Sequence, residues 1–67
     1  MNFTIESEQE EDGRWLGEVA GIPGVLAYGA TQSEAMAKAE ALALRALAER
    51  LECGESGPLA ISISPAA

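Results

Sequence analysis

The sequence predicts an α+β fold, a single small domain over residues 1–67 with the element order β-β-β-α-β. Residues 31–53 are the only run long enough for a multi-turn helix, because alanine and leucine dominate the run and it contains no Gly or Pro. The other segments are short, alternate between apolar and polar residues, and are bounded by turn residues, as strands are. We therefore expect a mostly antiparallel sheet with one helix packed on one face.

Residues 2–7 are the first predicted strand, because apolar and polar side chains alternate along them. The acidic run over residues 8–12 ends in Asp12-Gly13, a pair that favours a positive φ and marks a hairpin. Carboxylates in this run could suggest a metal site, but they lack the spaced oxygen ligands of a calcium loop. We interpret the run as a solvated turn.

Residues 14–20 are the second predicted strand, with Trp15, Gly17 and Val19 on one face. We expect this face to look toward the helix, because a glycine there leaves room for a close helix while the indole supplies a large apolar area. An exposed recognition aromatic is the alternative for Trp15, and a position in the core is preferred.

Residues 25–28 are the third predicted strand, which follows the turn Gly-Ile-Pro-Gly over residues 21–24. This turn is not a phosphate-binding loop, since it lacks the Lys and the Ser or Thr that such a loop requires. The helix is predicted over residues 32–52. Thr31 and Glu34 have the spacing of a capping box, and Gly54 can close the last turn in a left-handed conformation.

The predicted helix is apolar around most of its circumference, which is more than one contact requires. The face expected to lie on the sheet consists of Ala35, Met36, Ala39, Leu42, Ala43, Ala46 and Leu47. A second face consists of Ala37, Ala41, Leu44, Ala48 and Leu51. Exposed alanines are good helix formers in any case. We nevertheless interpret the second face, together with the open edge of the third strand, as an interface of a homo-oligomer, a dimer or a tetramer.

Residues 59–64 are the fourth predicted strand, again with one apolar face. The helix reverses the chain direction after the third strand, so the fourth strand should run parallel to the first. A right-handed crossover then places it beside the first strand. The expected sheet order is 3-2-1-4.

The formal net charge is −7, with eleven acidic and four basic residues. Binding to nucleic acid requires clustered Lys and Arg, so no direct nucleic-acid contact is expected. An acidic surface suits a basic protein partner, although negative charge also keeps a small protein soluble. The candidate partner-binding residues are Glu6, Glu8, Glu10, Glu11, Asp12 and Glu18.

The chain has no His and a single cysteine, Cys53, so an ordinary zinc site and an internal disulfide are not expected. Its one Lys lies on the charged side of the helix, and its acids lie mainly in a turn and on solvent faces. We expect neither catalysis nor a cofactor. The first residues do not resemble a signal peptide, and no apolar run approaches the ~20 residues that span a bilayer. We expect a cytoplasmic protein.

Several of these features recur together in one order: a strand, an acidic turn that ends in Asp-Gly, an aromatic residue, a Pro-Gly turn, an aromatic-Gly-x-Thr step and a Glu-Ala-rich helix. In this order and spacing the chain resembles the HicB-like antitoxin family over residues 3 to 47. The matching positions are Asp12, Gly13, Trp15, Val19, Pro23, Gly24, Tyr28, Gly29, Thr31, Glu34, Ala35 and Ala39.

The resemblance implies a partial RNase-H-like fold and a non-catalytic antitoxin of a type II toxin-antitoxin system. Such a protein binds and neutralises a small basic toxin ribonuclease of the HicA type. Two-domain members of the family carry a DNA-binding segment after this domain, and the sequence leaves no room for one, so operator binding is not expected. The alternative is a stand-alone oligomeric module that binds a protein or a small ligand and has no cognate toxin.

Overall fold

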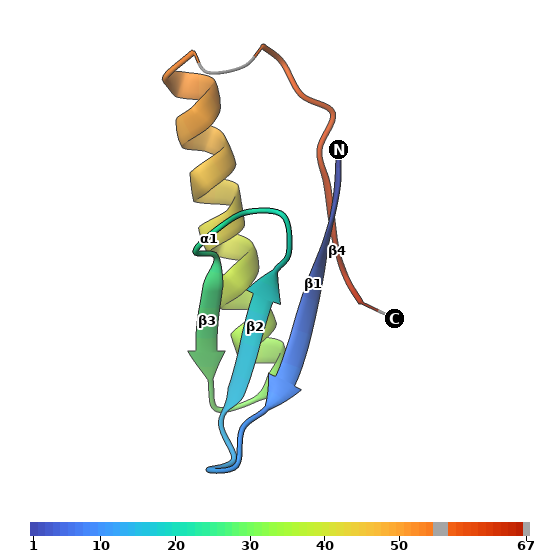
Figure 1. Ribbon diagram of the computed structural model, residues 1–67, viewed down its shortest axis with the longest axis vertical. Coiled ribbons are helices and arrows are strands. Elements are labelled where there is room, and N and C mark those ends of the chain that lie inside the picture. Colours follow the sequence, from blue (N-terminus) through green and yellow to red (C-terminus); the bar gives the residue numbers. More distant parts are fainter. Residues whose placement is uncertain (55–56, 67) are drawn as a thin grey trace.

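The computed structural model describes residues 1–54 and 57–66. It shows the predicted α+β architecture, a four-stranded mixed sheet with one helix against one face (Figure 1). The sheet order is β3-β2-β1-β4, as expected. The elements are β1 Asn2–Gln9, β2 Trp15–Val19, β3 Leu26–Gly29, α1 Gln32–Glu52 and β4 Ser62–Pro65.

Three ladders join the strands. β1 pairs antiparallel with β2, β2 pairs antiparallel with β3, and β1 pairs in parallel with β4. β4 begins later than predicted, at Ser62 instead of residue 59, because Ser62 pairs with Asn2, the first residue of β1. Residues 59–61 run past the start of β1, where the Met1 ammonium group donates to the Ala60 carbonyl oxygen at 2.7 Å without forming a strand pair.

β1 is longer than predicted, because it continues through Glu8 and Gln9 into the acidic run. Pairing with β2 extends it, since Glu8 lies opposite Leu16 and Gln9 lies opposite Trp15. The prediction of a turn at Glu8 is therefore wrong, and its carboxylate belongs to the sheet.

The helix bounds are confirmed, and so are the residues that begin and end the helix. The Thr31 Oγ1 accepts from the Glu34 N–H at 3.1 Å. The Glu34 carboxylate accepts from the Ala30 N–H at 3.3 Å, one residue before the position that a standard capping box uses. Gly54 has a φ of 74°, the left-handed value that was expected there.

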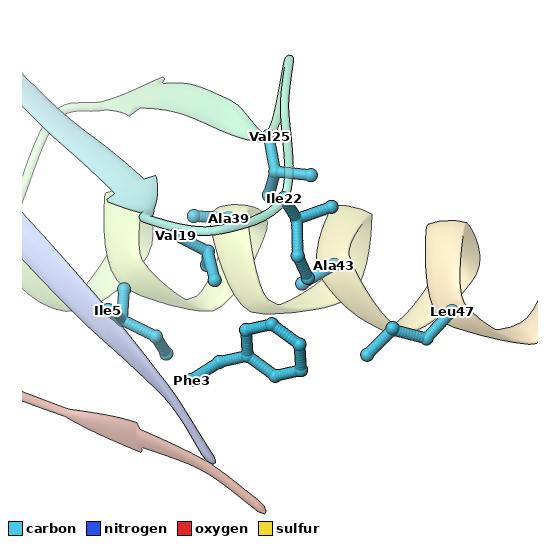
Figure 2. Packing of buried hydrophobic residues seen from close by; sticks show 8 residues of the cluster. All are labelled: Phe3, Ile5, Val19, Ile22, Val25, Ala39, Ala43 and Leu47. Carbon is cyan, nitrogen blue, oxygen red and sulfur yellow. The ribbon is translucent and has the colours of Figure 1, made fainter. Parts of the chain in front are cut away.

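The core lies between α1 and the sheet (Figure 2). Small residues on α1 bring its backbone close to the strands, and a Cβ built on Gly17 would lie 2.5 Å from the Ala35 carbonyl oxygen. A Cβ on Gly29 would lie 2.6 Å from the Ala35 nitrogen. The expected role of Gly17 is confirmed. The clustered buried residues are Phe3, Ile5, Val19, Ile22, Val25, Ala39, Ala43 and Leu47.

The predicted inner face of α1 is correct except at Leu42, which is 36% exposed. The buried residues Ala35, Ala39, Ala43 and Leu47 recur every four positions and define the centre of the contact, and Leu42 lies at the margin of that stripe. Trp15 is only half-buried and lies outside the buried core, so the prediction of a core position is wrong; as the first residue of β2 it lies at the end of the sheet where the hairpin begins. The C-terminal half of α1 extends beyond the ends of β2 and β3, as Figure 1 shows.

Candidate protein-binding surface

The face of the sheet opposite α1 carries a mixture of carboxylates and large apolar side chains. Strand register arranges them in two rows. In the first row, Leu16 on β2 lies between Glu8 on β1 and Tyr28 on β3. In the second row, Glu18 lies between Glu6 and Leu26, in the order of the strands. We call these six residues the open face: Glu6, Glu8, Leu16, Glu18, Leu26 and Tyr28.

The carboxylates of the open face are not balanced by nearby cations. Glu6 lies directly opposite Glu18, which places two like charges on neighbouring strands. In the described part of the chain, the side-chain ion pairs join Asp12 to Arg14 and Glu34 to Lys38, and none involves the open face. Like charges at opposite positions destabilise a sheet, so a cation from a partner would relieve this repulsion.

The open face leads into a cavity of about 480 Å³ at the end of β1. Glu6, Glu8 and Glu18 contribute to its lining, and Leu16 gives it an apolar wall. The cavity extends around the edge of β1 to Ser7, whose Oγ accepts from the Gln32 Nε2 at 2.8 Å. It is acidic on one side and can accept a cationic side chain.

The hairpin between β1 and β2 holds the other predicted acidic residues, Glu10, Glu11 and Asp12. Asp12 accepts from the Arg14 N–H at 3.0 Å and from the Arg14 Nε at 2.8 Å. Both hydrogen bonds lower the pKa of the Asp12 carboxyl, and the one from the Arg14 backbone N–H has the larger effect. Asp12 is thus already paired, and the free negative charge of the hairpin belongs to Glu10 and Glu11.

Arg14 has a second contact, because its guanidinium lies 4.6 Å from the centre of the Tyr28 ring. The predicted partner-binding residues did not include Arg14, Leu16, Leu26 or Tyr28. The alternation that predicted the core side of β2 also placed Leu16 on the same face as Glu18, so Leu16 could have been assigned to the candidate surface from the sequence.

The second helix face is exposed along its whole length. Leu44 is 52% exposed and Leu51 is 39% exposed. Next to this face, Lys38 Nζ lies 3.2 Å from the Glu34 carboxylate. The hydrogen bond from Lys38 is the largest cause of a lowered pKa at Glu34, and the hydrogen bond from the Ala30 N–H is the second. The members of the second face are Ala37, Ala41, Leu44, Ala48 and Leu51, all of them accessible to a partner.

Searches against protein-family models, curated proteins and solved structures found no match to this chain. None of the described helices is long and apolar enough to cross a membrane. Within residues 1–54 and 57–66, no three His, Cys, Asp or Glu side chains lie together as metal ligands would.

Proposed function

We propose that this protein is a non-catalytic antitoxin, similar to those of the HicB type, that binds a small basic ribonuclease toxin of the HicA type. The observation that carries the proposal is the open face, where carboxylates without a cation surround exposed apolar side chains. The order of motifs that resembles the HicB-like family supports the same function. Placement in the cytoplasm follows from this function and is part of the proposal.

The open face supplies the two contributions that a protein interface needs. Its carboxylates attract Lys and Arg side chains and accelerate encounter with a basic protein. Leu16, Leu26 and Tyr28 supply apolar area, which becomes favourable once water is removed from it. The antitoxin performs no chemistry. It neutralises the toxin by covering the surface on which the toxin would bind RNA.

The test begins with the reading frame next to the gene of this protein, which should encode a short basic protein that contains His. That protein, purified alone, should cleave RNA, and an equimolar amount of the acidic protein should stop the cleavage. A neighbouring protein that does not bind, or that cleaves RNA equally well in the complex, would rule out the antitoxin function.

A charge-reversal pair tests the electrostatic part of the mechanism. The double variant Glu10→Lys with Glu11→Lys should slow association, because it places cations on the approach to the open face. The matched control is Glu49→Lys with Glu52→Lys, which changes the net charge equally on the exposed side of α1. Equal association rates for the two double variants would show that total charge, and not the hairpin, governs encounter.

The second candidate function is a stand-alone oligomeric module without a toxin, and the exposure of Leu44 and Leu51 favours it. A domain of this size gains stability from self-association, and burial of one leucine contributes about 1.5–3 kcal/mol. Sedimentation equilibrium of wild type and of Leu44→Glu with Leu51→Glu tests the helix interface. An oligomer that persists unchanged in the double variant does not use the second helix face.

A further inference from the structure

Within the described residues, the backbone groups on the outer edge of β3 have no strand beside them. The Val19 N–H donates to the Val25 carbonyl oxygen at 3.1 Å, and the same ladder continues with Ala27 opposite Gly17 and Gly29 opposite Trp15. Backbone groups in a strand alternate in direction, so the N–H and C=O groups of Leu26 and Tyr28 point away from β2. β3 is the last strand on this side of the sheet.

This edge lacks the features that usually prevent pairing between sheets. The strand Leu26–Gly29 contains no charged residue and no proline. Leu26 is 45% exposed and Tyr28 is 42% exposed, and both side chains lie on the open face beside the edge. An exposed, uncharged and apolar edge strand is a template for another strand.

We propose that β3 pairs antiparallel with β3 of a second copy about a two-fold axis at Ala27, which joins the two sheets into one. Since the groups of Leu26 and Tyr28 point outward, each Leu26 lies opposite Tyr28 of the second copy in a hydrogen-bonded pair. This dimer does not depend on the proposed antitoxin function.

The distribution of charge identifies a second copy as the partner. Each copy has a net charge of −7, so two copies repel except where their facing surfaces lack carboxylates. In the paired sheet, Tyr28 of one copy lies opposite Leu26 of the other and Leu16 lies one strand further in, while Glu6 and Glu8 lie on β1, the third strand from the axis. Arg14 lies 4.6 Å from the centre of the Tyr28 ring, and Glu18 of the second copy lies next to Leu26 of that copy, so a cation and a carboxylate flank the facing Tyr28–Leu26 pair.

The helix also has a side that this dimer would cover. Met36, Ala37 and Glu40 line a cavity with Ile5 and Pro65, so that flank of α1 looks toward β1 and β4. The opposite flank, which contains Leu42, therefore looks toward β3. Strands lie about 4.8 Å apart, so pairing at β3 brings the two helices near the ~8–10 Å separation of packed helices. The exposed Leu42 then lies between them.

Disulfide trapping tests the register. In a Cys53→Ala background, Ala27→Cys places two thiols on the axis, in a non-hydrogen-bonded pair with Cα atoms about 4.5 Å apart, which a disulfide can bridge. Mild oxidation should yield a covalent dimer. The control is Thr4→Cys in the same background, at an exposed position in the middle of the sheet, and the oxidised control should remain monomeric on a non-reducing gel. Equal yields from the two variants would overturn the proposed register.

Sedimentation equilibrium tests the energetics. Leu26→Lys should weaken dimerisation at least about tenfold, because it removes an apolar contact twice and faces Arg14 of the second copy. Thr4→Lys adds the same charge at an exposed position of β1 and should not weaken dimerisation, and Leu44→Glu reports whether the second helix face is used instead. Wild-type dimerisation should strengthen from about 0.1 M to about 1 M salt, as screening reduces the repulsion between two acidic copies. A wild type that stays monomeric at high micromolar concentration, or a dimer that only Leu44→Glu disrupts, would overturn the proposal.

Discussion

On β1 and β2, successive side chains point to opposite faces of the sheet. The face covered by α1 differs from the open face in burial, packing and charge. Toward α1, the strands present Ile5, Gly17 and Val19, which are buried and closely packed. Toward solvent, the same strands present Glu6, Leu16 and Glu18, with two carboxylates directly opposite each other. The covered face holds the fold together, whereas the open face is not arranged for the stability of the isolated chain.

This difference supports the proposal that the open face binds a partner. A sheet face that served only solubility would not need exposed Leu26 and Tyr28, and one that served only stability would not place Glu6 opposite Glu18. Changes on the covered face should therefore destabilise the protein strongly, and changes on the open face should alter binding with little loss of stability.

The largest effect is expected at Gly17. The variant Gly17→Val should lower the free energy of unfolding by about 3 kcal/mol or more, because its Cβ would collide with the Ala35 backbone, which cannot rotate away as a side chain can. Urea denaturation measures the loss. Gly57→Ala is the control, since a Cβ there meets no atom within 4 Å, and its stability should match that of wild type.

Two leucines on α1 give the next largest contrast. Leu47→Ala should cost about 2–5 kcal/mol, because Leu47 is 2% exposed and its loss leaves a cavity beside Phe3. Leu44→Ala should change the stability of the single chain by less than about 0.5 kcal/mol. Thermal unfolding at low protein concentration compares the two variants, and similar losses would mean that the second helix face is covered in solution.

A moderate loss of stability is expected from a change at Thr31, the residue that caps the start of α1. Thr31→Ala should destabilise the protein by about 1 kcal/mol, since the Glu34 N–H loses the Oγ1 that accepts its hydrogen bond. Thr31→Ser keeps that oxygen and should restore most of the stability in the same denaturation experiment. A Thr31→Ser variant as unstable as Thr31→Ala would assign the effect to the lost methyl group.

The smallest predicted effect has the opposite sign. Glu18→Gln should stabilise the isolated protein by about 0.2–1 kcal/mol, because it removes the repulsion with Glu6. The gain should shrink as salt increases. A double-mutant cycle with Glu6→Gln measures the pair directly, and zero coupling between the two positions would show that solvent screens the carboxylates fully.

The sequence predicted the features that depend on neighbouring residues. Alternation in β2 identified Gly17 as the place where the helix comes close, and Thr31 identified the start of α1. Predictions failed where distant strands decide the outcome. Glu8 belongs to β1 because β2 pairs with it, and β4 begins at Ser62 because β1 begins at Asn2. Leu42 is exposed because the contact between α1 and the sheet is narrower than the apolar arc of the helix.

The open face was predicted in part. The acidic residues were identified from composition, but their division into a sheet group and a hairpin group depends on strand register. The pairing of Asp12 with Arg14, and the position of Arg14 above Tyr28, depend on side-chain geometry that charge counting does not contain. Leu26 and Tyr28 become candidate interface residues only because β3 lies at the edge of the sheet, which the local sequence around them does not show.

The most direct test of the open face as a binding surface is titration calorimetry with the small basic protein that the proposed function expects the neighbouring gene to encode. Wild type is compared with the triple variant Glu6→Gln, Glu8→Gln, Glu18→Gln, whose folded state is checked by circular dichroism. We predict that the triple variant folds at least as stably as wild type and binds at least about tenfold more weakly, with a smaller dependence on salt. A folded triple variant that binds with wild-type affinity and wild-type salt dependence would contradict the assignment of this face to a basic partner.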